Sequence, residues 1–186
     1  MKELSPGAQK ELNELLEEFP TKQSAIMMAL RVVEKDFGCI DDDAMKIVAY
    51  ACHVTIAHVL GMVTFYSHFK RPFHGKYRFM VCATLMCSLG NCESALAVIE
   101  KKLKLKPGQL TVDGLFSVEK VECLADCDKP PVLQMNFEHY TNMTSDKVEA
   151  FIDSLLEREG ISPSNYHVDV RDMDSLIPFI PVKENI

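Results

Sequence analysis

The sequence predicts an α/β protein in which an N-terminal helical bundle precedes a compact α/β domain. Two observations predict this class: apolar residues in the first third recur at helical spacing, whereas KYRFMVCA, residues 76–83, alternates as a strand does. From Lys76 onward we expect the order strand, helix, strand, strand, helix. The 186 residues, 47% of them hydrophobic, suffice for one compact core or two small ones that share an interface.

The predicted bundle covers residues 1–72, and its helices begin at typical capping residues. An amphipathic helix comes first, and Thr21 precedes a second helix that Gly38 ends. The acidic residues 41–43 precede the third helix, and Thr55 precedes the fourth. This part of the chain is therefore expected to be helical throughout.

The predicted α/β domain covers residues 73–160. Its strands are expected over residues 76–83, 115–123 and 131–136, and its helices over residues 93–106 and 145–159. Residues 161–186 lack periodicity and contain three prolines, so we expect an extended C-terminal tail. The tail is rich in apolar residues, which predicts that it packs along its own domain or along a partner.

Charge and hydropathy narrow the possible function. The 20 Lys and Arg against 27 Asp and Glu give a net charge of −7, which disfavours nucleic acid or an anionic membrane as the main partner. We find neither a signal peptide nor an apolar run of about eighteen residues, so we expect a cytoplasmic protein without direct membrane insertion. In that reducing compartment the seven cysteines are expected to be thiols or metal ligands.

Four cysteines have the positions and spacing of a metal site. Cys82 ends the first predicted strand, Cys87 begins the following helix, Cys123 ends the second strand, and Cys127 lies in the loop before the third. If the first two strands are parallel neighbours, all four thiols fall at one edge of the sheet. Four thiolates there can bind a single zinc ion or a [2Fe-2S] cluster. The wide C-x4-C and C-x3-C spacings favour the cluster, and a zinc-stabilised interaction module is the alternative.

The remaining cysteines have plainer interpretations. If a helix starts near Cys87, Cys92 is turned from it by about 140° and moved by about 7.5 Å along the axis, so it does not face the same metal. We interpret Cys92, Cys39 and Cys52 as buried small thiols. No catalytic Ser/His/Asp or Cys/His group is evident. A thiol redox enzyme is a third hypothesis, although the Cys82–Cys87 pair lacks the C-x2-C spacing of that class.

Several segments together resemble one family. They are KYRFMVCATLMC, TVDGLFSVEKVEC, the Cys123–Cys127 pair followed by PPVLQMN, and upstream GMVTFYSHF. These segments resemble the thioredoxin-like [2Fe-2S] subunit of respiratory complex I, the NADH:quinone oxidoreductase, which has relatives in NAD-linked hydrogenases and formate dehydrogenases. The resemblance covers roughly residues 10–158. It implies a helical bundle joined to a thioredoxin-like domain, with Cys82, Cys87, Cys123 and Cys127 as ligands of one [2Fe-2S] cluster.

The resemblance also implies a place in a larger respiratory complex. A cluster carries one electron whereas NADH gives up a two-electron hydride, so a flavin must stand between them. The eight glycines form neither G-x-G-x-x-G nor a P-loop, so we expect FMN and NADH to be bound by a partner subunit. This chain would exchange single electrons with that flavin and would not be catalytic alone. It would lie in the peripheral arm of the membrane-bound complex, on the cytoplasmic side.

The loop between the last two cysteines departs from the family pattern C-L-G-A-C. This chain has Leu124, Ala125 and Asp126 there. If the turn requires a positive φ at residue 125, alanine costs on the order of 1 kcal/mol relative to glycine. The Asp126 carboxylate is expected to disfavour the reduced, more negative cluster and so to lower its potential. Pro130 and Pro131 lie where thioredoxin-like folds often place a cis-proline.

Overall fold

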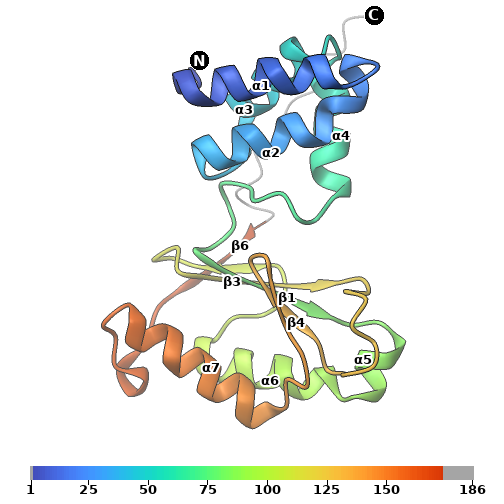
Figure 1. The fold of residues 1–186 in the computed structure, drawn as a ribbon. Helices are drawn as coiled ribbons and strands as arrows, with labels where there is room; N and C mark the ends of the chain where they lie inside the picture. The colour runs from blue at the N-terminus through green and yellow to red at the C-terminus, as the bar shows by residue number, and fades with distance from the viewer. Residues whose placement is uncertain (1, 174–186) are drawn as a thin grey trace, which may run out of the picture. The chain divides into compact units, whose positions relative to one another are not determined.

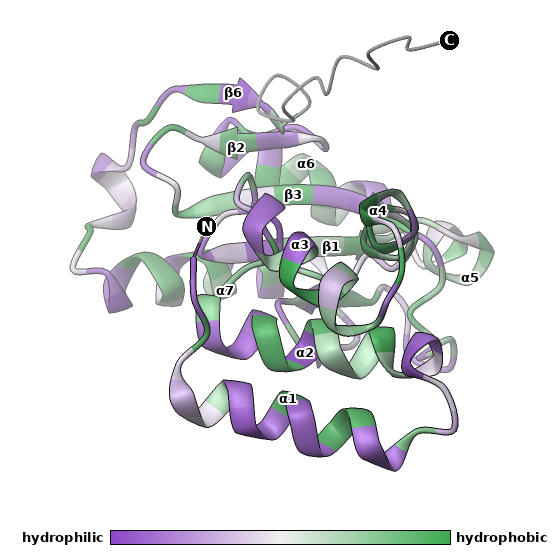
Figure 2. Ribbon diagram, turned by 90° about the horizontal axis from the view of Figure 1, so that it is seen from above, coloured by the Kyte–Doolittle hydropathy of each residue, from purple (hydrophilic) through white to green (hydrophobic). Residues whose placement is uncertain are grey.

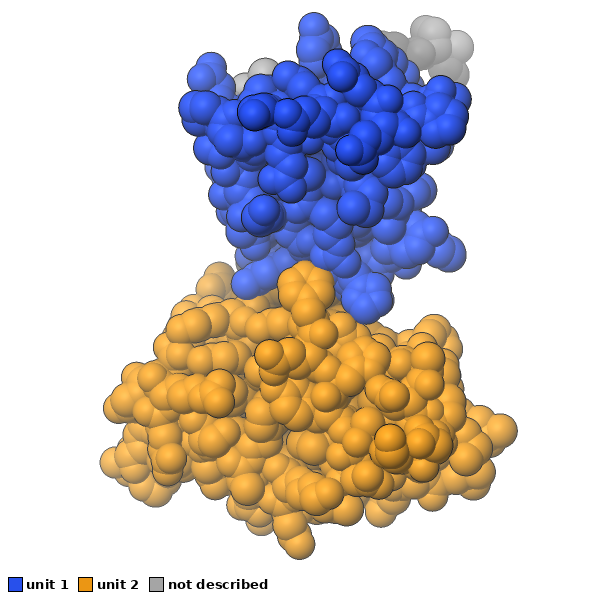
Figure 3. Space-filling view, viewed as in Figure 1, with its two compact units in different colours: residues 1–72 blue, residues 73–186 orange. Residues whose placement is uncertain are grey.

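The chain divides into two compact units, Met1–Pro72 and Phe73–Ile186, which Figure 3 shows in different colours. The structure is a computed structural model, and it describes residues 2–173. Each unit has a hydrophobic core of its own. Within residues 2–173 no single helix is long and apolar enough to cross a membrane. The helices Asp42–Ala51 and Ile56–Phe65 have the required length and hydropathy only when they are counted together, and a bend of 118° separates them.

Unit 1 is a helical bundle. Its α-helices are α1 (Pro6–Glu18), α2 (Ile26–Phe37), α3 (Asp42–Ala51) and α4 (Ile56–Phe65), as Figure 1 shows. The side chains of Asp41 and Thr55 cap α3 and α4, and Gly38 ends α2 with a φ of 78°, as the sequence predicts. Thr21 instead caps a 3₁₀ turn, Lys22–Ala25, because α2 begins only after that turn.

The apolar faces of these helices pack into the core of unit 1. In Figure 2, hydrophobic and hydrophilic stretches alternate along α1 and α2, as expected of helices with one buried face. The most deeply buried side chains include Leu12, Leu30, Val33, Met45, Val48 and Val59. Full burial of one such side chain stabilises the fold by about 1.5–3 kcal/mol. Packing of these faces is therefore what holds the helices together.

Unit 2 is built around a mixed six-stranded sheet with the strand order β5-β4-β1-β3-β2-β6. The strands are β1 (Tyr77–Cys82), β2 (Gln109–Thr111), β3 (Phe116–Val121), β4 (Leu133–Met135), β5 (Glu138–Tyr140) and β6 (Val170–Asp172). The central strands β1 and β3 are parallel, and the other neighbouring pairs are antiparallel. Together with the helices, this sheet confirms the predicted α/β class.

The helices α6 (Cys92–Leu103) and α7 (Ser145–Arg158) cover one face of the sheet, and the short α5 (Leu85–Leu89) precedes α6 (Figure 1). Phe79 of β1 packs in the same core as Ile99 of α6 and Ile152 of α7. The rings of Phe79 and Phe116 stack with their centroids 5.9 Å apart, across the β1–β3 pair. This packing fixes β1 against β3 and so fixes the ends of the two strands relative to each other.

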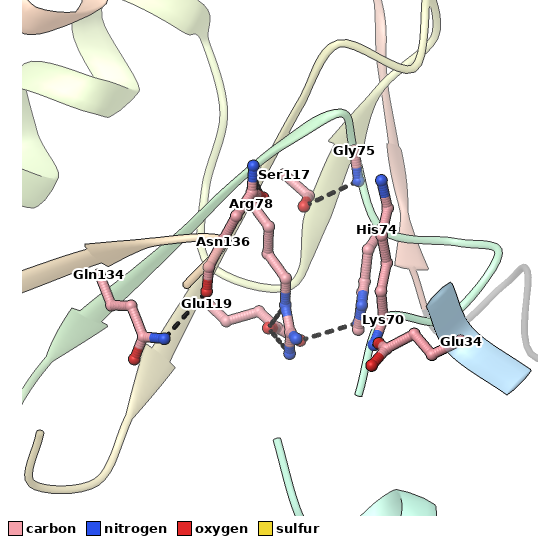
Figure 4. Close-up of polar contacts among 9 residues, drawn as sticks. All are labelled: Glu34, Lys70, His74, Gly75, Arg78, Ser117, Glu119, Gln134 and Asn136. Atoms are coloured by element: carbon pink, nitrogen blue, oxygen red, sulfur yellow. Dashed lines mark hydrogen bonds and ion pairs between the residues drawn. The ribbon is translucent and has the colours of Figure 1, made fainter. Parts of the chain in front are cut away.

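The opposite face of β1 and β3 carries a charged network (Figure 4). Arg78 Nε donates to Glu119 Oε2 at 2.7 Å, and His74 Nε2 lies 3.5 Å from Glu119 Oε1. Arg78 and His74 are both buried. Burial raises the pKa of Glu119, but the hydrogen bond from His74 and the charge of Arg78 bring that pKa below its usual value. The network therefore favours an ionised Glu119 inside the fold.

The sequence pattern predicts β1, β3 and β4 but not the three other strands of the sheet. β2, β5 and β6 have three residues each, which is too short for an alternating pattern to reveal. β6 lies within residues 161–186, the segment expected as a tail, and its Val170 pairs with Thr111 of β2. Residues 174–186 of that expected tail lie outside the described residues.

Candidate metal centre

The central strand pair brings the two cysteine motifs to one edge of the sheet. β1 and β3 run parallel in a register that places Cys82 opposite Val121, the last residue of β3. Both strands therefore end at the same edge, as predicted. Cys82 is the last residue of β1, whereas Cys123 lies two residues beyond the end of β3 instead of ending it. The chain that follows each strand carries the second cysteine of each pair.

The first pair is buried. Cys82 and Cys87 are 2% and 1% exposed, so both thiols lie inside the fold. Thr84 precedes α5 at its N-cap position, but its hydroxyl does not cap the helix. It lies instead 3.2 Å from Cys82 Sγ. Cys87 lies in the middle of α5 rather than at the start of the long helix that the sequence suggests.

The second pair lies in the loop between β3 and β4. Cys123 is exposed and Cys127 half-buried, and their sulfur atoms are 3.3 Å apart. The Ala125 N–H donates to Cys123 Sγ at 3.4 Å. Ala125 has a φ of 70°, so the turn does require a positive φ at this position, as expected. The alanine therefore adopts a backbone conformation that glycine tolerates better.

The loop between β3 and β4 affects the acidity of the first pair. The backbone of Leu124, from within the second motif, acts to lower the pKa of Cys82, and the backbone of Val132 acts in the same direction on the pKa of Cys87. The hydrogen bond with Cys123 and burial raise the pKa of Cys127, and the Cys82 thiol adds to that rise. Within residues 2–173, no three Cys, His, Asp or Glu side chains converge on a single ion position. The four thiols form two pairs that follow the ends of β1 and β3, and a two-iron cluster takes two thiolates on each iron.

The two thiols of the first pair differ in acidity. Burial raises the pKa of Cys82, but hydrogen bonds from the Thr84 hydroxyl and from the N–H groups of Thr84 and Leu124 bring it below the ordinary thiol value. Burial and the hydrogen bond with Cys82 raise the pKa of Cys87 to about 11. Cys82 is therefore the thiol of this pair that ionises first, and thiolates are the form that binds metals.

Asp126 does not stand alone beside Cys127. Its Oδ2 lies 2.7 Å from Nδ1 of His139, on β5. The same loop is bonded to the chain after β5, because the Asn142 N–H donates to the Lys129 carbonyl at 2.9 Å. Sequence reasoning missed His139, since β5 was not predicted and thirteen positions separate the two residues. The EHY segment alternates too briefly to have revealed it.

The other cysteines lie outside this group of pairs. Cys92 is the first residue of α6 and fully buried, as expected of a core thiol. The expected continuous helix from Cys87 is wrong, because Asn91, with a φ of 64°, separates α5 from α6. Cys52 is buried as expected. Cys39 is only half-buried, so its interpretation as a core thiol is wrong.

A glycine that sequence reasoning overlooked holds the second motif against α5. A Cβ on Gly90, at the end of α5, would come within 2.8 Å of Cβ of Pro130. The Pro130–Pro131 peptide bond is cis. The Met143 N–H donates to the Pro131 carbonyl at 2.9 Å, which ties this loop to the residues before α7. Close packing at Gly90 therefore fixes where the second cysteine loop passes the first pair.

The chain is similar in sequence to a known family and to several characterised proteins. The model of the thioredoxin-like [2Fe-2S] ferredoxin family matches residues 12–156. NADH-quinone oxidoreductase subunit 2 of Thermus thermophilus is 37% identical over 147 residues, which cover 77% of this chain and 81% of that protein. An NADH-quinone oxidoreductase subunit of Escherichia coli is 30% identical over 156 residues, which cover 84% of this chain and 92% of that protein.

A solved structure shares the fold. A chain of the NAD+-reducing [NiFe]-hydrogenase in its air-oxidized state superimposes with a TM-score of 0.61 at 16% sequence identity. The match covers 75% of this chain but only 24% of the hydrogenase chain, so this protein spans about a quarter of that neighbour. The fold, the paired cysteines and the sequence relatives agree with one another: the chain belongs to the family of thioredoxin-like [2Fe-2S] ferredoxins.

Proposed function

We propose that this chain is an electron-transfer subunit of an NADH-quinone oxidoreductase, and that Cys82, Cys87, Cys123 and Cys127 hold one [2Fe-2S] cluster. The observation that carries the proposal is the pairing of thiols after two adjacent parallel strands. The first pair is buried, and the second has its sulfur atoms 3.3 Å apart. Four cysteines grouped in this way are the usual ligand set of a [2Fe-2S] cluster.

The chain's own residues would prepare the site for that cluster. When bound, the cluster supplies one-electron redox chemistry. The backbone groups of Thr84 and Leu124 act to lower the pKa of Cys82, and the backbone of Val132 acts in the same direction on the pKa of Cys87. Groups that lower a thiol pKa in this way stabilise negative charge on ligand sulfur atoms and tune the potential. The buried first pair excludes water from one side of the site, while the second pair lies nearer the surface.

The partner in this proposal is a subunit that binds FMN and NADH. A hydride carries two electrons and a [2Fe-2S] cluster carries one, so a flavin is needed between them. The sequence contains no glycine-rich nucleotide fingerprint, and the relatives named above are subunits of NADH-quinone oxidoreductases. The proposed position of the chain is therefore beside the flavin subunit, in the peripheral arm of a membrane-bound complex on the cytoplasmic side.

Purification of the native assembly tests the choice of complex. We expect the tagged full-length chain to bring down an FMN-containing subunit and an activity that reduces quinone with NADH. Hydrogen evolution or formate oxidation in the same preparation would instead assign the chain to an NAD-linked hydrogenase or a formate dehydrogenase. Recovery of the chain without any flavoprotein would contradict the proposed partner.

A panel of serine substitutions tests the ligand assignment. Replacement of Cys87 or Cys123 is expected to abolish the visible absorption of the anaerobically purified protein or to change its spectrum, because one iron would lose a thiolate. Cys92→Ser is the matched control: it replaces another buried thiol of the same unit and is expected to keep the cluster. A spectrum that survives Cys87→Ser unchanged and is lost in Cys92→Ser would overturn the assignment.

A further inference from the structure

A side-chain contact ties the second cysteine loop to an edge strand of the sheet. Asp126, directly before Cys127, places its Oδ2 2.7 Å from His139 Nδ1. An ionised carboxylate only accepts hydrogen bonds, so the proton of this contact sits on the ring nitrogen. Both side chains are 37% exposed, which leaves the contact only partly screened by solvent.

The position of His139 is fixed through the sheet. β5 pairs with β4 in a register that places His139 opposite Gln134, and β4 pairs with β1 so that Gln134 is opposite Met80. Met80 lies two residues before Cys82 on the same strand. The imidazole is therefore held at a set place relative to the first cysteine pair, while its partner belongs to the loop of the second pair. The contact therefore ties the second cysteine loop to the sheet whose central strand carries Cys82.

The charges near this contact do not replace the imidazole. Lys129 Nζ lies 3.4 Å from the carboxylate of its neighbour Asp128. The carboxylate of Glu138, next to His139 on β5, accepts from the Tyr140 hydroxyl. These charged groups of the loop and of β5 thus have contacts of their own, and the ring of His139 is the group that donates to Asp126.

This arrangement changes the expected effect of Asp126. Reduction adds negative charge to a cluster, and a bare carboxylate beside Cys127 would oppose it. A hydrogen-bond donor 2.7 Å from the carboxylate stabilises its negative charge and so weakens its effect on the cluster. We infer that His139 is a positioning residue that holds the Asp126 carboxylate through this hydrogen bond, and that the Asp126–His139 contact thereby tunes the reduction potential of the cluster. The inference rests on the proposed function, because it requires the cluster to be present.

A double-mutant cycle read out as a midpoint potential tests the inference. The full-length variants His139→Ala, Asp126→Asn and the double variant are titrated at one pH and followed by EPR. Removal of His139 from the natural chain is expected to lower the potential and to reduce severalfold the ratio of reduced to oxidised cluster at a fixed poise. A tenfold change in that ratio corresponds to about 59 mV for one electron. Asp126→Asn is expected to raise the potential.

The decisive comparison is the effect of His139→Ala in the two backgrounds. The Asp126→Asn background has no carboxylate for the ring to hold, so removal of the ring from it is expected to leave the potential unchanged. Equal shifts in both backgrounds, or no shift in either, would overturn the inference. His167→Ala is the matched control, because it removes an exposed imidazole elsewhere in unit 2 and is expected to cause no shift.

Two further measurements keep the test interpretable. His139→Phe removes the donor but keeps a ring, so it replaces His139→Ala if the smaller side chain fails to retain the cluster. Loss of the cluster from both variants would show a purely structural role and would overturn the inference. Iron and sulfide contents are measured on every variant and on the natural chain. Absence of a cluster from the natural chain would contradict the proposed function itself, which separates the two failures.

Discussion

At the scale of single residues, the cysteine loop contains a backbone conformation that its alanine does not favour. Ala125 has a φ of 70° between the two ligands of the second pair. The sequence pattern anticipates this position because the related motif has glycine there. His139 could not be anticipated in the same way, since its contact with Asp126 depends on how β5 pairs with β4. Local patterns thus predict ligands and turns, whereas contacts made across a sheet follow only from the fold.

Ala125→Gly is expected to stabilise the protein. Left-handed backbone costs a non-glycine residue about 1–2 kcal/mol, and the greater entropy of unfolded glycine offsets part of the gain, which leaves an increase of about 1 kcal/mol in the free energy of unfolding. Urea unfolding followed by circular dichroism measures it. Gly114→Ala is the reverse control, since Gly114 has a φ of 73° and open space around its Cα, and this change should destabilise. Equal stability of Ala125→Gly and the natural chain would contradict the expected strain.

Glu119 is expected to make a pH-dependent contribution to stability. Its pKa in the folded protein lies below the usual 4.5, so its contribution is present above that pH and is lost as the pH falls through the folded value. Glu119→Gln removes the carboxylate that faces the buried Arg78 and is expected to cost about 3 kcal/mol at neutral pH. The difference in unfolding free energy between the variant and the natural chain, measured by urea titration, should therefore become smaller below pH 4.5.

A matched control separates this effect from general acid unfolding. Glu149 lies 3.4 Å from Lys102 and is 55% exposed, so Glu149→Gln is expected to change stability little at any pH. Comparison of each variant with the natural chain at the same pH cancels the titration of the other carboxylates. Two results would contradict the proposed role of the network. One is a loss of unfolding free energy in Glu119→Gln that stays constant down to about pH 3, well below the ordinary carboxyl pKa. The other is a loss at neutral pH that is as small as the loss in Glu149→Gln.

At the scale of elements, the site depends on segments that the sequence pattern shows only in part. The strands β1 and β3 have six residues each, which is long enough for the alternation of their side chains to be recognised in the sequence. The three-residue strands are too short for that, and their existence follows from pairing with longer neighbours. The break between α5 and α6 was also missed, because Gly90 and Asn91 interrupt a run that otherwise continues with helical spacing.

Gly90→Ala is expected to disturb the contact between α5 and the second cysteine loop. An added Cβ would lie 2.8 Å from Pro130 Cβ, so either the helix end or the loop must shift, and overpacking of this kind costs about 1–3 kcal/mol. The measurements are urea unfolding and the iron content after purification. Gly61→Ala in α4 is the control, because nothing lies within 4 Å of the added atom and the change favours helix. A Gly90→Ala variant as stable and as iron-rich as the control would contradict this packing role.

At the scale of the whole molecule, the chain combines a helical unit with a thioredoxin-like unit that carries the cysteine pairs. The class of fold and the position of all four cysteines at one sheet edge follow from the sequence, because strand alternation and motif spacing are local features. The identity of the metal group does not follow from spacing alone, since four thiolates also suit zinc. Membership of the [2Fe-2S] family and the pairing of the thiols both favour iron.

The metal content of the intact chain tests the central claim most directly. Full-length protein purified anaerobically is analysed for iron, sulfide and zinc, and its EPR spectrum is recorded at low temperature after reduction. We expect reddish-brown protein with about two irons and two sulfides per chain and a rhombic signal from the reduced cluster. Colourless protein with one zinc per chain, or metal-free protein with disulfide reductase activity, would contradict the account.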